Sequence, residues 1–214
     1  RGPQALSALY RAGTLRGGTD VMRAEICGLV LAGGQGRRMG GVDKGLVEFR
    51  GRPFVAHVIE RLRPQVDALL INANQNLEQY AAFGHDVVPD RLGGFAGPLA
   101  GLDAGLHATT APLLVTAPCD SPFLPRDLVA RLANARADDD ADLAVARTGT
   151  QPHPVFALVH TRVRPHLARF LSSGERKIDL WYSTLRVVEV AFDDEPEAFI
   201  NINTRGEIAQ FERS

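Results

Sequence analysis

The stretch Ile26-Cys-Gly-Leu-Val-Leu-Ala-Gly-Gly-Gln-Gly-Arg-Arg-Met-Gly-Gly-Val-Asp-Lys44 decides the fold class of this chain. Its first seven residues are mostly apolar and include β-branched side chains, which is typical of a buried strand in a parallel sheet. The glycines that follow permit a tight turn and allow bare backbone N–H groups to approach an anion. A buried strand that runs into such a turn predicts a ligand site at the carboxyl edge of an α/β sheet.

Outside this stretch, apolar strands alternate with amphipathic helices. We expect further strands at residues 68–73, 86–88, 112–117, 143–146 and 155–159, and an edge strand at 186–190. Helices are expected at residues 53–62, 77–83, 98–108, 125–135, 163–171 and 204–211, the last with Thr204 as its N-cap. The alternation predicts a single α/β domain with a doubly wound, mostly parallel, Rossmann-like sheet and helices on both faces.

Length and composition exclude several classes of protein. The chain has 214 residues, with 24 Lys and Arg against 25 Asp and Glu, so the formal net charge is −1. No overall positive field is present to attract nucleic acid or an anionic membrane, and no apolar run approaches the ~20 residues that span a bilayer. The two cysteines cannot form a disulfide framework. We therefore expect a cytoplasmic protein that binds neither nucleic acid nor a membrane.

Two segments are expected to carry no chemistry. Residues 1–21 contain four glycines and three arginines with little periodicity, so we interpret them as a leader or a remnant of upstream sequence outside a domain that covers residues 22–214. The acidic run at residues 138–140 lacks the alternating ligand spacing of a calcium loop. We interpret it as a solvated turn.

The glycine-rich loop itself has the composition of a phosphate site. Its backbone freedom comes from Gly33, Gly34 and Gly36, and its positive charge comes from Arg37, Arg38 and Lys44. It is not a P-loop, because the run G-x-x-x-x-G-K-[ST] is missing, and Met39 stands where the dinucleotide fingerprint needs its third glycine. The alternative is a glycine turn with solvated arginines.

This loop resembles the signature of nucleotidyltransferases that join a nucleoside monophosphate to a phosphorylated acceptor. Its longer form, LAGG-x-x-R-R-M-G-G-x-D-K-G, is similar to that of the molybdenum cofactor guanylyltransferase family (MobA type). The likeness extends from about Cys27 to the C-terminus, in the family's order, through residues 51–53, 72–74, 97–101, 118–122, 153–154, 174–176 and 201–204. It implies the nucleotidyltransferase fold, with a nucleotide-binding half at about 26–123 and an acceptor-binding half at about 124–214.

The resemblance assigns roles on the nucleotide side. It implies that Lys44, Arg38 and Asp120 are catalytic and that GTP lies over Leu31, Ala32, Gly33, Gly34 and Gly36. Asp120 follows the strand at 112–117 and would hold Mg²⁺, or alternatively Mn²⁺, because Mg²⁺ prefers one or two carboxylates together with phosphate oxygens. The other interpretation of Asp120 is a turn residue that caps a helix.

Two more polar residues follow strands at the same predicted edge. The resemblance implies that Asn72 and Asp90 contact the guanine, and both have groups that can hydrogen-bond a base. Which of the two reads the base stays open, as do the alternatives of a strand cap and a turn residue. Cys119 has no assigned base beside it and is interpreted as a packed residue.

Five residues are assigned to the acceptor side: His153, Arg176, Lys177, Asn201 and Asn203. The resemblance implies that they contact the pterin, its phosphate or the metal. The alternatives are core packing for the histidine, which lacks partners at metal-ligand spacing, and an exposed helix for Arg176 and Lys177.

The implied reaction is transfer of GMP from GTP to the terminal phosphate of Mo-molybdopterin, with release of pyrophosphate. The implied partners are GTP and molybdopterin, with transient contacts to molybdopterin-synthesis proteins and apo-molybdoenzymes, and we expect a monomer. Three alternatives stay open: a molybdopterin cytidylyltransferase, a sugar- or polyol-phosphate nucleotidyltransferase, and a non-catalytic carrier of nucleotide or cofactor. Gly33-Gly34 favours guanine, because the cytidylyl branch usually reads L-A-A-G.

Overall fold

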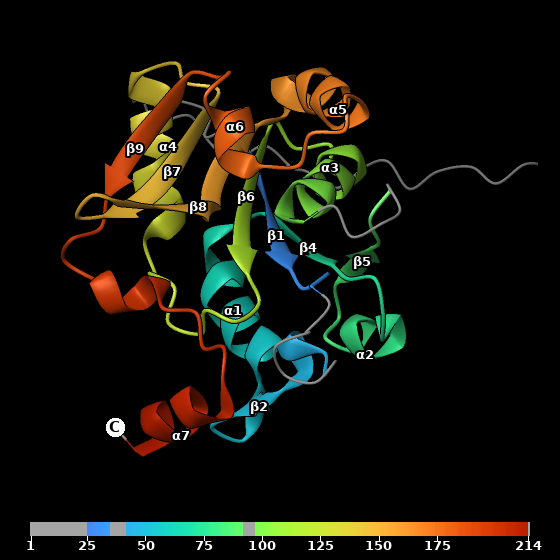
Figure 1. Cartoon of the computed structure of the whole chain (residues 1–214), viewed down its shortest axis with the longest axis vertical. Coiled ribbons are helices and arrows are strands. Elements are labelled where there is room, and N and C mark those ends of the chain that lie inside the picture. Colours follow the sequence, from blue (N-terminus) through green and yellow to red (C-terminus); the bar gives the residue numbers. More distant parts are fainter. Residues whose placement is uncertain (1–24, 35–41, 92–96, 214) are drawn as a thin grey trace, which may run out of the picture.

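The computed structural model describes residues 25–34, 42–91 and 97–213. Within these ranges one sheet of seven strands has the order β5-β4-β1-β6-β8-β7-β9 (Figure 1). The predicted leader lies outside the described residues. No helix in the described part of the chain is long and apolar enough to cross a membrane. The strands of the sheet are β1 (Ile26–Leu31), β4 (Ala68–Asn72), β5 (Asp86–Val88), β6 (Leu113–Pro118), β7 (Leu143–Thr148), β8 (Gln151–His160) and β9 (Val187–Ala191).

The strand directions confirm the predicted mostly parallel sheet. β1 pairs in parallel with β4 and β6, and β4 pairs in parallel with β5. β8 is antiparallel to both β6 and β7, whereas β9 runs parallel to β7. Within this sheet, as far as the structure describes it, β8 is therefore the one reversed strand. The carboxyl ends of β1, β4, β5 and β6 consequently meet at one edge of the sheet.

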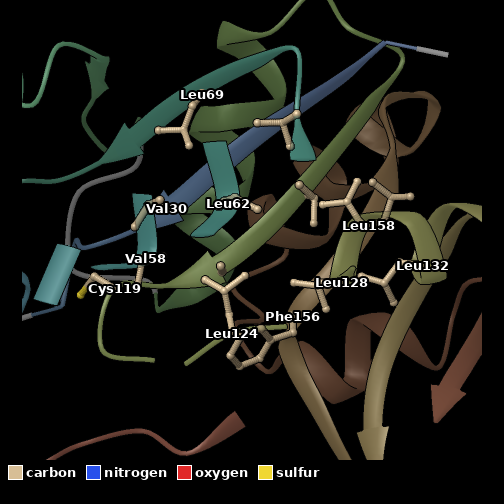
Figure 2. Packing of buried hydrophobic residues seen from close by; sticks show 14 of the residues in the cluster. Val30, Val58, Leu62, Leu69, Cys119, Leu124, Leu128, Leu132, Phe156 and Leu158 are labelled. Atoms are coloured by element: carbon tan, nitrogen blue, oxygen red, sulfur yellow. The ribbon is translucent and has the colours of Figure 1, made fainter. Parts of the chain in front are cut away.

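Helices cover both faces of the sheet, as the alternation predicted. α1 (Phe54–Leu62) and α4 (Leu128–Asp138) pack on one face, where Figure 2 shows Val58, Leu62, Leu128 and Leu132 beside side chains of the sheet. The opposite face is covered by α3 (Pro98–Ala108), α5 (Arg164–Ser172) and α6 (Ile178–Tyr182). Neighbouring residues of β1 supply both cores because successive side chains of a strand point to opposite faces.

A third, smaller core lies beyond the sheet. It joins the hairpin of β2 (Glu48–Phe49) and β3 (Arg52–Pro53) to α7 (Arg205–Arg213) and to the segment before it. Its buried members are Phe49, Phe54 and Ile202, and the two phenylalanine rings stack at 5.3 Å. Arg50 adds polar contacts, since its backbone N–H donates to Glu212 at 2.9 Å. The C-terminal segment is thereby attached to the N-terminal half of the chain.

Several predicted elements need correction. The helix expected at 125–135 begins at Leu128, and the strand expected at 155–159 is the second half of the longer β8. The hairpin β2–β3 and helix α6 were not predicted. Thr204 is the N-cap of α7, as expected, because its hydroxyl accepts from the N–H of Glu207 at 3.1 Å. The remaining elements are α2 (Leu77–Ala81), η2 (Lys44–Leu46), η3 (Arg63–Gln65), η4 (Thr161–Val163) and η5 (Pro196–Phe199).

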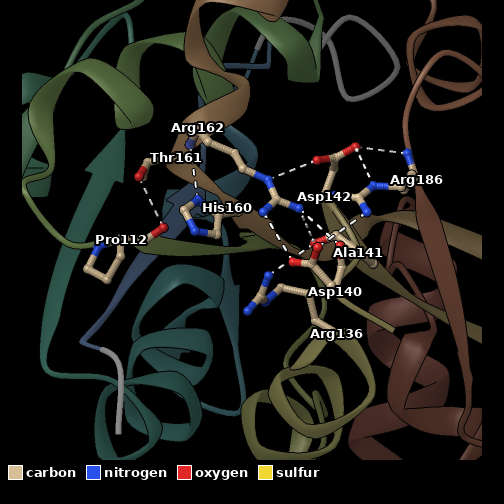
Figure 3. A network of polar contacts seen from close by, with 9 residues as sticks. All are labelled: Pro112, Arg136, Asp140, Ala141, Asp142, His160, Thr161, Arg162 and Arg186. Carbon is tan, nitrogen blue, oxygen red and sulfur yellow. Dashed lines mark hydrogen bonds and ion pairs between the residues drawn. The ribbon is translucent and has the colours of Figure 1, made fainter. Parts of the chain in front are cut away.

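An ion-pair network fixes the edge of the sheet at β7 and β9 (Figure 3). Asp142 accepts from the side chain of Arg162 and from the backbone N–H of Arg186, each at 3.0 Å. Asp140 is exposed, as expected of a solvated turn, but its carboxylate also pairs with both arginines, at 3.2 and 3.3 Å. The acidic turn therefore joins β7 to the segments that precede α5 and β9.

We expect Asp142→Asn to destabilise the protein at neutral pH. Partial burial alone would raise the pKa of Asp142, but hydrogen bonds from Arg186 and Arg162 and their two charges outweigh it and lower that pKa below its usual value. The stabilisation is therefore present above the unfolded-state pKa and is lost as the pH falls through the lower folded-state pKa. A lost charge-assisted hydrogen bond costs about 1.5–3 kcal/mol, or ~3–12 °C in melting temperature for a chain of this size.

Thermal unfolding of wild type and Asp142→Asn at pH 7 and at pH 3 measures this effect. The difference in melting temperature should narrow at pH 3. The matched control is Asp139→Asn, since Asp139 is an exposed residue of the same turn. An Asp142→Asn variant as stable as wild type at pH 7 contradicts the prediction.

Candidate active site

Three strand ends converge where the predicted loop begins. The N–H of Ala32 donates to the carbonyl of Asn72 at 2.8 Å, and the N–H of Cys119 donates to the carbonyl of Leu31 at 3.0 Å. The ends of β4, β1 and β6 are therefore held side by side, with Gly33 and Gly34 leaving β1 at their centre. Gly36, Arg37 and Arg38 lie outside the described residues.

Lys44 joins two segments that are distant in the sequence. It opens η2, and its ammonium donates to Oδ2 of Asp120 and to Oδ1 of Asn203. The side chains of Lys44 and Asp120 are only 19% and 13% exposed, so water screens their attraction less than it screens a surface ion pair. The structure thus brings together three of the predicted site residues as one cluster.

The segment that carries Asn201 and Asn203 is attached to the loop after β6. The N–H of Ile202 donates to the carbonyl of Asp120 at 3.1 Å, and the hydroxyl of Ser121 donates to Asn201 at 2.5 Å. Glu207 accepts from the N–H of Asn203 at 2.6 Å. Sequence analysis missed the roles of Ser121 and Glu207. For Glu207 the T-x-x-E capping pattern was a usable signal, and Ser121 lies in the stretch 118–122 that shares in the resemblance.

A second cluster forms beyond β4 and β5. Asn72 and Asn74 each donate to one oxygen of the Asp90 carboxylate, both at 2.9 Å. The backbone N–H of Asp90 donates back to the side chain of Asn74 at 2.8 Å. Sequence analysis placed Asn72 and Asp90 at one edge but missed Asn74, although its distance of two residues from Asn72 was the available signal.

Two glycines leave room for the amide of Asn72, which is only 2% exposed. A Cβ at Gly33 would lie 2.9 Å from Oδ1 of Asn72, and a Cβ at Gly101 would overlap the same oxygen. Both positions therefore require glycine because backbone and side chain approach closely. The close approach of α3 to the Asn72 side chain at the end of β4 explains the glycine near the start of α3.

The turn after Asp90 has an anchor of its own. Asp103 of α3 is only 3% exposed, and its carboxylate accepts from Arg91 at 3.1 Å. A buried carboxylate needs such a partner, because an unpaired charge in the protein interior is costly. The Asp103–Arg91 pair therefore fixes the chain next to Asp90, a role that sequence analysis did not find.

The structure places the residues predicted for the acceptor side in different parts of the fold. His153 stacks on Phe199 with a ring separation of 4.6 Å, and its Nε2 lies 2.8 Å from the hydroxyl of Thr148. Burial lowers the pKa of His153 below its usual value, so the ring is neutral near pH 7. Arg176 donates to the carbonyl of Leu171 at 2.7 Å, and Lys177 is the N-cap residue of α6. In the described residues these two basic residues belong to the turn between α5 and α6, not to the Lys44 cluster.

Cys119 is a packed residue, as expected. It is a free thiol, 7% exposed, in the core on the α1 face. Burial, together with the nearby Asp120 charge, raises the pKa of this thiol far above its usual value. A neutral thiol is a poor nucleophile, so the residue serves packing.

The Lys44 cluster fits a divalent cation that is shared with phosphate. The described residues contain no group of three or more His, Cys, Asp or Glu that could hold a metal by themselves. Asp120 and Asn203 nevertheless direct one carboxylate and one amide oxygen at the same cation, the Lys44 ammonium. Oxygen donors of this kind, completed by phosphate and water, suit Mg²⁺.

Comparison with known proteins identifies the family of this chain. Residues 28–186 match the family model of the MobA-like NTP transferase domain. The chain is 50% identical over 190 residues to a molybdenum cofactor guanylyltransferase of Shewanella putrefaciens, covering 89% of this chain and 97% of that protein. It is also 50% identical over 197 residues to the protein of the same name from Cupriavidus necator, with 90% and 98% covered.

A solved structure shows the same architecture. The molybdopterin-guanine dinucleotide biosynthesis protein A of Archaeoglobus fulgidus superimposes with a TM-score of 0.73 at 25% sequence identity, covering 87% of this chain and 97% of that one. Fold, family model and sequence relatives all agree. The chain belongs to the MobA-like NTP transferase family.

Proposed function

We propose that this protein is a molybdenum cofactor guanylyltransferase, which transfers GMP from GTP to the terminal phosphate of Mo-molybdopterin and releases pyrophosphate. The observation that carries the proposal is the Lys44–Asp120–Asn203 cluster at the same sheet edge as the Asp90 carboxylate. One cluster suits phosphates and a cation, and the other suits a base with N–H donors. The names of relatives at about half identity support the same activity.

On the nucleotide side, GTP would lie over Leu31, Ala32, Gly33 and Gly34, with Gly36 and Arg38 continuing the phosphate cradle. Lys44 would neutralise charge that develops on the phosphates during transfer. Asp120, with Asn203 beside it, would hold Mg²⁺, which supplies further charge neutralisation when bound. The attacking phosphate of the acceptor is already an anion, so alignment and electrostatics suffice and no strong general base is required.

Asp90 is the residue that we assign to base recognition. Its carboxylate is held by Asn72 and Asn74 but keeps lone pairs that can accept from guanine N1–H and the 2-amino group. Asn72 is almost fully buried and donates to the carbonyl of Val88 as well as to Asp90. We therefore give Asn72 a positioning role.

On the acceptor side we propose residues from the half at about 124–214. Asn201 and Asn203 would face the acceptor phosphate, because their segment is attached directly to Asp120 and Ser121. The imidazole ring of His153, which stacks on Phe199, would provide a flat surface for contact with the pterin. Arg176 and Lys177 would contact negative charge on the acceptor.

Free, buried thiols at Cys27 and Cys119 agree with a reducing compartment. We therefore propose a cytoplasmic enzyme that acts as a monomer and passes its product to apo-molybdoenzymes through transient contacts. Light scattering after size-exclusion chromatography would test the oligomeric state.

Pyrophosphate release tests the function most directly. Purified protein with Mg²⁺ and Mo-molybdopterin is offered GTP and CTP in parallel, and we expect release with GTP only. Release with CTP would assign the chain to cytidylyl transfer. Tight GTP binding without release in either reaction would refute the transferase and favour a carrier.

A further inference from the structure

A hydrogen-bonded group beneath the Lys44 turn attaches that turn to α2. Asp43, which precedes Lys44, is only 7% exposed, and its carboxylate accepts from the hydroxyl of Tyr80 at 2.5 Å and from the amide of Asn76 at 3.0 Å. Tyr80 is a fully buried residue of α2, and Asn76 is the N-cap residue of that helix. Since a buried carboxylate needs such donors, the three side chains form one fixed unit.

The same hydroxyl also contacts the residue after Lys44. A Cβ at Gly45 would overlap Oη of Tyr80, so the backbone of the turn lies directly against that oxygen. The turn closes with a hydrogen bond from the N–H of Leu46 to the carbonyl of Asp43 at 3.1 Å. Both neighbours of Lys44 are thus held by Tyr80, and the backbone from which the lysine extends cannot shift without breaking this contact.

Tyr80 also lies close to the other partner of the ion pair. It belongs to the same core cluster as Cys119, and Cys119 directly precedes Asp120. Burial is the main cause that raises the pKa of Tyr80 far above its usual value, and the hydrogen bond to Asp43 adds to it. The hydroxyl is therefore protonated, and it remains a hydrogen-bond donor throughout the working pH range.

We propose that Tyr80 is a positioning residue for the transfer reaction: through Asp43 and Gly45 it fixes the turn that directs Lys44 at Asp120 and at the nucleotide phosphates. This inference rests on the proposed function of Lys44. A lysine side chain has four flexible carbons, so its contribution to a transition state depends on how firmly its backbone is held. Loosening the turn should reduce turnover more than it reduces GTP binding.

The first test is Tyr80→Phe, which removes the hydroxyl and keeps the ring in the core. We expect kcat to fall about tenfold, as a misplaced catalytic group would cause, while KM for GTP changes by no more than about twofold. The matched control is Tyr182→Phe, because the Tyr182 hydroxyl donates to the carbonyl of Pro154 at 2.7 Å. That variant should lose similar thermal stability and keep its kcat. An equal fall of kcat in both variants would overturn the proposal.

A double-mutant cycle asks whether the effect passes through Lys44. In the Lys44→Ala background, measured with excess enzyme in single turnovers, Tyr80→Phe should cause no further loss of rate, because the group that it positions is missing. Losses that multiply across the two variants would mean that Tyr80 acts independently of Lys44, and the proposal would be wrong.

A third measurement needs no substrate. The chain contains two lysines, Lys44 and Lys177, so trace acetylation followed by peptide mass spectrometry gives the ratio of their reactivities at one pH. A released Lys44 amine should be acetylated severalfold faster relative to Lys177 in Tyr80→Phe, and unchanged in Tyr182→Phe. An unchanged ratio in Tyr80→Phe overturns the positioning role. A raised ratio in a protein whose wild type transfers no GMP would refute the proposed function and keep the positioning role.

Discussion

Replacing Asp120 by alanine is expected to reduce kcat for guanylyl transfer by about 10²-fold or more, the loss seen when one preorganised electrostatic contact is removed from an active site. Asp120 is the carboxylate of the cluster and the residue that we assign to Mg²⁺. Its removal would also leave the Lys44 ammonium with Asn203 as its remaining partner in the described cluster. Both effects act on charge at the phosphates, so turnover should suffer more than GTP binding.

The measurement is the Mg²⁺ dependence of pyrophosphate release in wild type, Asp120→Ala and Asp120→Asn. The asparagine variant keeps the shape and loses the charge, so it should be impaired nearly as strongly. Asp127→Ala is the control, since Asp127 is a mostly exposed carboxylate that follows the same loop. Near-normal Mg²⁺-dependent turnover in Asp120→Ala would show that the metal is held elsewhere.

Replacing Asp90 by asparagine should lower kcat/KM for GTP by about 10²-fold, because charge-assisted hydrogen bonds to a buried partner are worth roughly 1.5–3 kcal/mol. The loss should appear mainly in KM, since the base is bound equally in the ground state and the transition state. The variant amide would in addition present N–H groups towards Asn72 and Asn74, which themselves donate to this carboxylate. The substitution would therefore disturb the hydrogen bonds around the base and would also remove the negative charge that contacts it.

Comparing GTP with ITP separates base recognition from general damage. ITP lacks the 2-amino group, so wild type should prefer GTP, and Asp90→Asn should lose most of that preference. The exposed Asp86, at the start of β5, provides Asp86→Asn as the control. An unchanged preference for GTP over ITP in Asp90→Asn would show that another residue recognises the base.

The parts of the fold that were predictable have their signal in local sequence. β5 and α3 coincide with their predicted bounds because an apolar run and a helix-starting proline mark them directly. The hairpin β2–β3 escaped prediction because each strand has two residues and depends on packing against Phe54 and α7. Prolines 152 and 154 hid the first half of β8, since proline removes a ladder donor. α6 has five residues and is stabilised by the buried Trp181.

For the candidate site, the sequence indicated most of the residues with chemical roles but few of the residues that hold them in position. The loop, Asp120, Asn72 and Asp90 could be located because ligand-binding residues follow strand ends in such a sheet. Tyr80 could not be assigned, since its role depends on partners that only folding brings near. The hydroxyl of Tyr80 meets Asp43 across 37 residues, and no local pattern carries that information.

The contact between Lys44 and Asn203 spans 159 residues and has a consequence for how the protein is made. During synthesis, β1, β4, β5 and β6 can emerge and pair before α7 has been translated, because domains begin to fold from the N-terminal side. With the nucleotide side assigned as we propose, the edge for the nucleotide would form on the ribosome before the segment proposed to meet the acceptor phosphate. The arrival of Asn203 and α7 against the β2–β3 hairpin completes the Lys44 cluster, so this cluster forms only after residues 203–213 have been translated.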